Sequence, residues 1–514
     1  MDVVLDLEPS LSMVARSTVA LSELEASRIR QIITKQECKL ELLTGKITEA
    51  KALLCKLFTE EAQATRIRDT YRSLLSPIRR LPAELLGVVF VFCLPNSSFV
   101  LPEKRHAPLL LTRICSSWRT IALSTPELWS RLRIVHHVNG RGQRKLNDID
   151  HIIAPFMALW LSRSGSFPLS ISITGIAMKQ SILDVLSHHS SHCRRLELIR
   201  MHSWSSFRIS HRDFPILRRL HVHSRVPDVK VFPYLIASAP ELVDLRWEVG
   251  SHVDGPSSLT ITSSLPWAQL KRILLGSSTS TSIELLLDIF AMCPLLEYAD
   301  IPFSGGNDIL PRAKILLPYL SSLVLSTFGP SQDYTPIFTY LTAPRLRSLT
   351  CIHGSALPRQ ILQHFINRSS CALENLDLRN LTELAHITEY LQIVGNSLKS
   401  FTLCTTDLTV ADELLNALTL NLWTPCLCPN LETLNLMDDV SRPQGALAAM
   451  VRSRLQADED TYQPVNTRSV RLKNLGIRSG DVDFHELRHM QQLGLILNIV
   501  ESASFFDLSI CDSD

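Results

Sequence analysis

A short pattern of apolar positions recurs along most of the chain: one apolar residue, two others, a second apolar residue, one other, and a third apolar residue. Successive copies begin 24 to 33 residues apart. The clear copies are Cys193/Leu196/Leu198, Leu217/Leu220/Val222, Leu242/Leu245/Trp247, Leu270/Ile273/Leu275, Leu296/Ala299/Ile301, Leu320/Leu323/Leu325, Leu346/Leu349/Cys351, Leu373/Leu376/Leu378, Leu398/Phe401/Leu403 and Leu431/Leu434/Leu436. Weaker copies are Trp129/Leu132/Ile134, Leu472/Leu475/Ile477 and Met490/Leu493/Leu495.

This pattern and its spacing resemble the leucine-rich repeat, in which each unit adds one strand to a parallel sheet and returns through a helix or turn. We therefore expect an α/β fold, with an irregular leucine-rich-repeat solenoid over residues 129–498. Return helices are expected at Ser282–Met292, Ile387–Val394 and Ala411–Leu422, and an exposed loop around Asp458. Six copies have proline two residues before the first anchor, where it ends the return segment: Pro215, Pro240, Pro294, Pro318, Pro344 and Pro429.

The residues between the anchors alternate onto the other face of the predicted sheet. In the early repeats these residues are mostly charged, whereas in the middle repeats they are mostly small. We expect a protein substrate to bind the early face; the alternative is a solvated face with no ligand. The candidate substrate-binding residues are Arg195, Arg219, His221, Asp244, Arg246, Arg272 and Tyr298.

Residues 20–76 carry a different period, with alternating steps of four and three residues. The resulting seam is Ile29, Ile33, Gln36, Leu40, Leu43, Ile47, Ala50, Leu54, Leu57, Glu61, Ala64, Arg68, Tyr71 and Leu75. A heptad seam of this length predicts a long coiled-coil helix, which Pro77 ends. Its partner is either a second copy, giving a homodimer, or the chain's own body. Residues 1–19 are expected to be a disordered N-terminus and residues 499–514 a C-terminal tail.

Residues 77–128 predict two short helices with more apolar surface than they can bury on each other. One follows Leu81-Pro82 and carries Leu85, Val89 and Phe90; the other carries Leu110, Ile114, Cys115 and Trp118. Such a surplus favours a groove on a partner protein. The alternative is a plain helical hairpin between two domains.

The residues Leu-Pro-x-Glu-Leu at 81–85, an apolar pair at 89–90 and Cys-x-x-Trp at 115–118 resemble the F-box. In that family the module binds the Skp adaptor of a Skp–cullin–F-box ubiquitin ligase. The ending Trp118-Arg119, followed by Ser124-Thr125-Pro126-Glu127-Leu128-Trp129, resembles the fungal members in particular. The resemblance implies a Skp-type adaptor, and through it a cullin, as partners. The implied adaptor-binding residues are Leu81, Pro82, Glu84, Leu85, Val89, Phe90, Leu110, Ile114, Cys115 and Trp118. The loop from Pro95 to Pro108 is longer than the family pattern and is expected to bulge into solvent.

The combined expectation is a non-enzymatic adaptor, in which the repeats hold a substrate that a ligase modifies. The rival interpretation is a repeat scaffold outside any ligase. A more distant one is a zinc peptidase, because His485-Glu486-x-x-His489 matches the spacing of zincin ligands. No P-loop, Rossmann glycine pattern or nucleophile elbow occurs, so we expect no catalytic residues, metal or cofactor.

Composition limits the class of partner further. A formal net charge of +2 over 514 residues gives no reason to expect nucleic acid. The longest apolar run, from Leu85 to Leu94, is too short to span a membrane, and the first residues lack the pattern of a signal peptide. Twelve cysteines at irregular spacing then predict reduced thiols and a cytoplasmic or nuclear protein.

Overall fold

The computed structural model describes residues 22–135, 146–175, 180–201, 214–224, 239–249, 266–276, 281–304, 312–327, 333–355, 357–381, 387–404, 408–420, 427–437, 445–455, 470–478 and 483–500. The chain divides into two compact units, residues 1–86 and 87–514. The expected terminal segments, except for residues 499 and 500 of the tail, and the expected loop around Asp458 lie outside the described residues.

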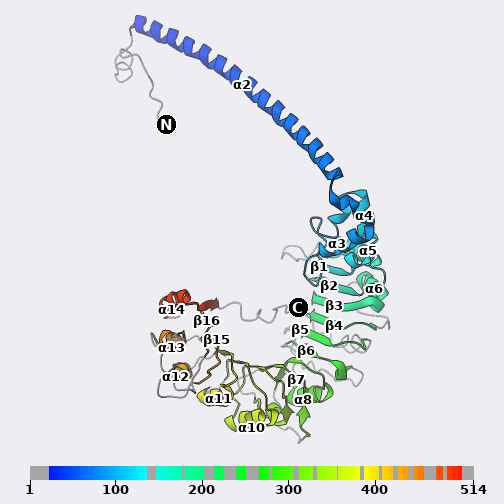
Figure 1. Cartoon of the computed structure of the whole chain (residues 1–514), viewed down its shortest axis with the longest axis vertical. Helices are drawn as coiled ribbons and strands as arrows, with labels where there is room; N and C mark the ends of the chain where they lie inside the picture. The colour runs from blue at the N-terminus through cyan, green and yellow to red at the C-terminus, as the bar shows by residue number, and fades with distance from the viewer. Residues whose placement is uncertain are drawn as a thin grey trace. The chain divides into compact units, whose positions relative to one another are not determined.

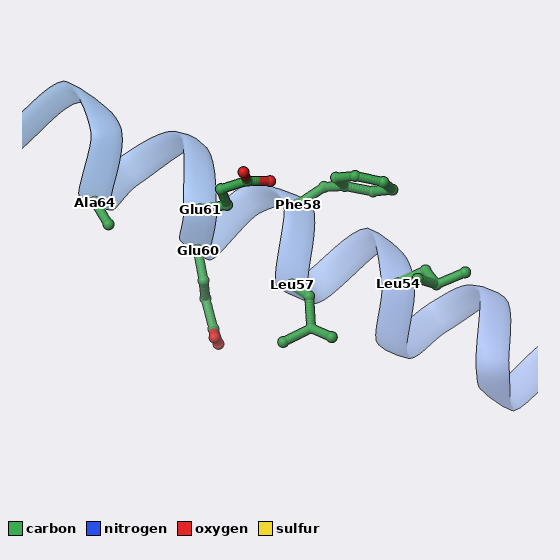
Figure 2. A pocket seen from close by; sticks show the side chains of 6 residues that line it. All are labelled: Leu54, Leu57, Phe58, Glu60, Glu61 and Ala64. Carbon is green, nitrogen blue, oxygen red and sulfur yellow. The ribbon is translucent and has the colours of Figure 1, made fainter.

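The first unit contains one long helix, α2 (Glu23–Leu74), of 52 residues. Ser22 caps its N-terminus in a reciprocal arrangement: the Ser22 hydroxyl accepts from the Glu25 N–H, and the Glu25 carboxylate accepts from the Ser22 N–H at 3.0 Å. The helix ends just before Pro77, which opens the 3₁₀ turn η1 (Pro77–Arg80). No residue of α2 is buried, and Figure 2 shows the stretch from Leu54 to Ala64 with its side chains projecting from the helix. The expected long helix is confirmed; its pairing as a coiled coil remains a prediction.

The helical segment that follows has shorter elements than the sequence predicts. They are α3 (Ala83–Phe92), η2 (Leu111–Arg113), α4 (Ser116–Leu123) and η3 (Pro126–Trp129). The second expected helix is divided, because Cys115 takes an extended conformation and caps α4, its Sγ accepting from the Trp118 N–H at 3.4 Å. The loop before it was expected to bulge into solvent, and this is wrong for Phe99 and Val100. Both are buried, and the Val100 carbonyl accepts from the Arg133 N–H at 2.8 Å.

A single parallel sheet organises the second unit. Among the described residues it has fifteen strands in chain order, with β7 paired to β8 beside the main path. The strands are β1 (Arg131–Val135), β2 (Leu169–Thr174), β3 (Cys193–Met201), β4 (Arg219–Ser224), β5 (Asp244–Val249), β6 (Arg272–Leu275), β7 (Thr281–Ser282), β8 (Tyr298–Ser304), β10 (Ser322–Thr327), β12 (Ser348–Ile352), β13 (Asn375–Arg379), β14 (Ser400–Cys404), β15 (Thr433–Leu436), β16 (Asn474–Arg478) and β17 (Ile496–Val500). Two further short strands, β9 (Ile315–Leu316) and β11 (Leu341–Thr342), pair with each other. This arrangement confirms an α/β fold with a solenoid-like parallel sheet.

The register of the sheet places equivalent anchors side by side. Leu196 pairs with Leu220, Leu220 with Leu245 and Leu245 with Ile273, and the alignment continues to Leu475 through each clear repeat. These anchors are buried on one face, toward the return helices. Each repeat therefore completes the core of its neighbour, as expected for a stack in which no unit can bury its apolar face alone.

The six prolines lie in one recurring turn. In each case the N–H of the first anchor donates to the carbonyl of the residue just before the proline, as Leu217 does to Phe214 at 3.2 Å and Leu431 does to Cys428 at 3.3 Å. The proline therefore occupies the second position of a four-residue turn, where its fixed φ is favourable. The expectation that proline directs the chain into the strand is confirmed.

The return segments lie along one side of the sheet (Figure 1). Their helices are α5 (Leu146–Ser162), α6 (Gln180–His188), α8 (Ile283–Met292), α9 (Thr335–Tyr340), α10 (Arg359–Ser369), α11 (Ile387–Val394), α12 (Leu408–Leu418), α13 (Ala446–Leu455) and α14 (Phe484–Met490). Short 3₁₀ turns are η5 (Ser190–His192), η6 (Trp267–Gln269) and η8 (Gln491–Leu493). The expected helices at 282–292 and 387–394 match α8 and α11. The third, expected from Ala411 to Leu422, instead begins at Leu408 and ends at Leu418.

Two repeats differ from the sequence pattern. Strand β2 was not predicted: Pro168 occupies the first anchor position, and Leu169, one residue later, pairs with Cys193 through an irregular register. The last weak copy has the wrong register, because Leu497 and not Leu493 pairs with Leu475. Leu493 lies in η8 and is exposed. Within the described residues, no helix has the length and apolar character needed to cross a membrane.

Candidate ligand-binding face

The face of the sheet opposite the anchors, between β1 and β8, is here called the open face. Two of its rows cross successive strands. The first row is Arg131, Ser170, Arg195, Arg219, Asp244, Arg272 and Tyr298, and the second is Arg133, Ser172, Glu197, His221, Arg246, Leu274 and Asp300. Residues far apart in sequence therefore become neighbours at the spacing of adjacent strands, about 4.8 Å.

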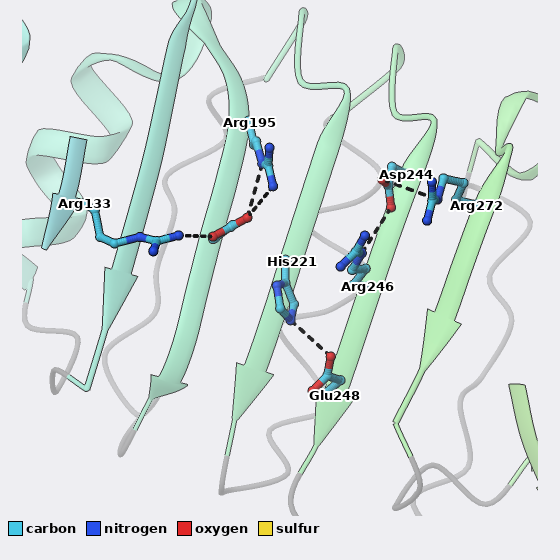
Figure 3. A network of polar contacts seen from close by, with 8 residues as sticks. Arg133, Arg195, His221, Asp244, Arg246, Glu248 and Arg272 are labelled. Carbon is cyan, nitrogen blue, oxygen red and sulfur yellow. Dashed lines mark hydrogen bonds and ion pairs between the residues drawn. The ribbon is translucent and has the colours of Figure 1, made fainter. Parts of the chain in front are cut away.

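The first cluster on this face is built around Glu197. The Arg195 guanidinium donates to its carboxylate at 2.9 Å, and the Arg133 Nη2 lies 3.9 Å from the other oxygen (Figure 3). Both guanidinium groups also lie over the ring of Phe99, at 4.8 Å and 5.1 Å from its centroid. The Glu197 side chain is only 7% exposed, so its charge is held in place by two arginines rather than by water.

The second cluster is built around Asp244. Arg246 Nε lies 3.8 Å from one carboxylate oxygen and Arg272 Nε lies 3.9 Å from the other (Figure 3). Arg272 also stacks on Tyr298, with its guanidinium carbon 5.2 Å from the ring centroid. At these distances the arginines are ion-paired without hydrogen bonds, and the Arg272 Nε has no hydrogen-bond partner among the described residues.

The third cluster is built around Glu248. Its two oxygens lie 3.2 Å from His221 Nε2 and 2.8 Å from His223 Nδ1. Burial would raise the pKa of Glu248, but the hydrogen bonds from the two histidines outweigh it and hold the pKa well below its usual range. The third cluster therefore holds a fixed negative charge beside two imidazoles.

Asp300 lies at the edge of the third cluster and has the opposite electrostatic behaviour. Burial, and then the negative charge of Glu248, raise its pKa to about 7, although a hydrogen bond from Tyr298 partly offsets them. Burial also raises the pKa of Tyr298 to about 12. The Asp300 carboxyl therefore keeps its proton to a much higher pH than an ordinary aspartate does.

The three clusters have the same arrangement: in each, one carboxylate lies between two basic side chains. Arg219 adds a further guanidinium in the middle of the first row, where it is exposed and has no ion pair among the described residues. With two arginines for each of Glu197 and Asp244, the open face carries an excess of positive charge even though its acids are paired. Their pairing fixes the arginines in position.

All seven candidate substrate-binding residues lie on this face. Arg195, His221, Asp244, Arg246, Arg272 and Tyr298 join the clusters, and Arg219 lies among them. Sequence reasoning did not include Arg133 and Phe99. Arg133 could have been found, since it lies between the anchors Leu132 and Ile134 of a weak repeat. Phe99 comes from the preceding loop, which has no repeat pattern.

The ten residues that the F-box resemblance implies divide into exposed and packed groups. In residues 1–86, Leu81, Pro82, Glu84 and Leu85 are exposed; in the second unit, Val89, Leu110, Ile114 and Cys115 are exposed. Phe90 is fully buried and its ring lies 4.8 Å from that of the half-buried Trp118. Phe90 and Trp118 therefore pack against each other within the second unit, while the exposed apolar residues remain available to a partner.

The His485-Glu486-x-x-His489 motif lies on α14. The imidazole centroids are 5.6 Å apart, and Glu486 forms an ion pair with Arg452 at 2.6 Å. Glu501, the downstream carboxylate best placed by sequence to be a third ligand, lies outside the described residues. Within the described part of the chain, no group of three histidine, cysteine or acidic side chains is arranged to hold a metal ion.

Comparison with known proteins gives no family. No family model matches the chain, and no curated protein does. Among solved structures, a chain of the complex of Rad7 and Elc1 in yeast is 13% identical, with 74% of this chain and 94% of that chain covered and a TM-score of 0.34. A protein from Bacteroides fragilis is 12% identical, with 56% of this chain covered and a TM-score of 0.30; this chain spans 66% of its length. With TM-scores this low, the architecture rests on the sheet and repeats of the chain itself.

Proposed function

We propose that this protein is a substrate receptor of a Skp–cullin–F-box type ubiquitin ligase. In this proposal residues 77–128 bind a Skp-type adaptor, and the open face binds a protein substrate. The chain supplies proximity and orientation, and a separately recruited enzyme supplies the chemistry. The rival proposal is a repeat scaffold outside any ligase.

The proposal that the chain binds an adaptor rests on one observation. Short helices carry exposed apolar residues next to a packed pair of aromatic rings. Phe92 is 84% exposed, and Val88, Val89 and Ile114 are also exposed, whereas Phe90 packs against Trp118. Exposed apolar side chains that lie close together, unlike single ones, often mark a surface that binds a partner protein. Their spacing on a short helix fits insertion of an apolar face into a partner groove.

Replacing Ile114 with aspartate tests the adaptor half. A charge in the centre of a desolvated interface should weaken binding by at least roughly tenfold. The matched control is Leu159→Asp on α5, because Leu159 is 55% exposed and Ile114 is 54% exposed. Binding of the full chain to a purified Skp-type adaptor would be measured by calorimetry. If the unmodified chain did not bind the adaptor, the scaffold proposal would be favoured. Equal losses of affinity in both variants would show that Ile114 is not part of the interface.

The charge of the open face indicates the class of substrate. Two arginines bracket each of Glu197 and Asp244, and Arg219 is exposed between them. Planar guanidinium groups held in fixed positions suit carboxylates, which they bind through paired hydrogen bonds. We propose that the substrate presents an acidic segment to the open face.

Reversing the charge of Arg219 tests the substrate half without breaking a cluster. Simultaneous reversal of Arg246 and Arg272 would place two further acids beside Asp244 and disturb the fold. Arg219→Glu should reduce the affinity for a glutamate-rich peptide several-fold, whereas Arg218→Glu should not. Arg218 lies next to it but pairs with Glu241 in an exposed contact.

Fluorescence polarisation would compare the glutamate-rich peptide with the same sequence carrying glutamine. Adaptor binding serves as an internal control for both variants. Equal affinity for the two peptides, or equal effects of the two reversals, would contradict an acidic substrate and leave the adaptor half unaffected.

A further inference from the structure

Helix α2 has an apolar face that stays exposed among the described residues. Leu40, Ile47, Leu54 and Leu57 on its seam are between 50% and 62% exposed, and no residue of the helix is buried. Long helices in water owe most of their stability to packing of such a face. The structure therefore leaves α2 in need of a partner helix.

A second copy in parallel orientation fits poorly. In a parallel pair each core position faces its own equivalent, so Glu61 would meet Glu61 and Arg68 would meet Arg68 of the partner helix. The flanking position at Lys46 would also face Lys51 of the other copy. Like charges at a core position are costly because they are removed from water.

The antiparallel orientation removes the like-charge conflicts at the core positions. In such a pair, facing core residues have numbers with a constant sum, and complete overlap of Glu23 with Leu74 sets that sum to 97. With the same sum, Leu40 faces Leu57, Leu43 faces Leu54, Ile47 faces Ala50, and Glu61 faces Gln36. One register therefore gives both complete overlap of the helices and apolar contacts along the seam. In it, Glu61 faces the side-chain amide of Gln36, which can donate a hydrogen bond to it.

In this register, each flanking position that directly precedes a core residue such as Leu40 neighbours the equivalent flanking position of the other copy, and the numbers of these neighbours sum to 99 instead of 97. Lys39 lies opposite Glu60 of the other copy, which gives two ion pairs by symmetry, and Ile32 lies opposite Ile67. Figure 2 shows Glu60 and Glu61 beside the apolar Leu57 and Phe58, where a partner helix would cover them. Charges beside the seam select orientation and partner in helix pairs.

We propose that α2 pairs with α2 of a second copy of this chain in antiparallel orientation, in full overlap. The segments that follow Leu74 then leave the pair at opposite ends, separated by the length of the helix, about 78 Å for its 52 residues. The surface is symmetric, so the assembly closes as a dimer. This inference does not depend on the proposed ligase function.

The seam is tested with two leucines of equal exposure. Leu40 is 62% exposed on the seam and Leu42 is 60% exposed outside it. Leu40→Asp in the full chain should convert the dimer to a monomer in light scattering at micromolar concentration, and Leu42→Asp should leave it dimeric. Near-ultraviolet circular dichroism checks that both variants keep a folded repeat sheet. A monomeric unmodified chain, or equal behaviour of the two variants, overturns the proposal.

Orientation is tested by disulfide trapping. Copies carrying Leu40→Cys are mixed with copies carrying Leu57→Cys, and the linked peptides are mapped by mass spectrometry so that native thiols do not confuse the result. A disulfide between positions 40 and 57 of two copies is expected. A disulfide between two copies at position 40 would show a parallel pair and reject the inference.

Charge reversal gives an independent measurement of register. Lys39→Glu should weaken the dimer, and the addition of Glu60→Lys should restore it, because the two reversed side chains again attract. In a parallel pair these positions do not meet, so the second change would not restore association. Failure of restoration would contradict the proposed register.

Discussion

Asp300 lies where the open face changes from charged to neutral side chains, since Val324 and Thr350 take its position on the next two strands. Its carboxyl is held by Tyr298 and faces the negative charge of Glu248. Burial and the charge of Glu248 therefore explain the raised pKa of Asp300 without a bound ligand. Because the pKa is raised in the folded chain, it affects the stability of the fold.

The pKa of Asp300 predicts a pH dependence of stability. Its folded value is about 7 and its ordinary value 3.8, so between these pH values the folded chain keeps a proton that the unfolded chain releases. Protonation thus stabilises the fold, and this contribution is lost as pH rises toward and through 7. Asp300→Asn cannot ionise and should be more stable than the unmodified chain at pH 8 by roughly 1–4 kcal/mol, with little difference near pH 4.

Thermal unfolding at several pH values measures this difference. The exposed Asp288 provides a control, as Asp288→Asn should leave the pH dependence unchanged. If Asp300→Asn retains the full pH dependence of the unmodified chain, another group is responsible.

At the scale of elements, two arginines connect successive return helices. Arg454 on α13 is fully buried and donates to the carbonyls of Leu418 at 2.8 Å, Leu427 at 2.6 Å and Cys428 at 3.0 Å. Arg368 on α10 similarly donates to the carbonyls of Phe338 and Leu341 at the end of α9. The last carbonyls of a helix have no partner within it, and a cation there also complements the helix dipole. These arginines take the place of regular cap residues.

Replacing Arg454 with methionine tests this role. Methionine keeps much of the apolar stem but leaves buried carbonyls without a donor, so unfolding free energy should fall by roughly 2–4 kcal/mol. Arg452→Met on the same helix removes only an exposed pair with Glu486 and should cost about 0.5 kcal/mol. Denaturant unfolding measures both. Similar losses for the two variants would show that the carbonyl contacts contribute little.

At the scale of the whole molecule, prediction from sequence succeeded at positions that must be apolar because they fill the core. Anchors such as Leu220 and Leu245 must be apolar to fill the core, so their spacing predicted strands and register. The pattern failed at β2, where Pro168 replaces an anchor but the neighbouring repeats still complete the sheet. It also failed at Leu493, because apolar residues at 490, 493, 495 and 497 allow more than one frame.

The open face could be predicted as a set of residues but not as a set of pairs. Alternation placed His221 and Glu248 on the same face. Their contact, however, requires that β4 and β5 lie side by side, because the two residues are 27 positions apart in sequence. Phe99 could not be predicted at all, since its position depends on a loop that packs against Arg133 and Arg195. Similarly, the exposure of Ile114 and the burial of Phe90 follow from packing and not from the motif.

The parallel register of the open face also sets a length. From β1 to β8 along the main path, the described part of the sheet has seven strands and therefore six intervals, which at about 4.8 Å each span roughly 29 Å. An extended peptide lying across the strands advances about 3.4 Å per residue, so roughly nine residues cover this span. Beyond β8 the rows offer Ser322 and Ser348 in place of charged residues. In the proposed binding mode, a longer acidic segment would thus gain little affinity, because only the charged strands could contact it.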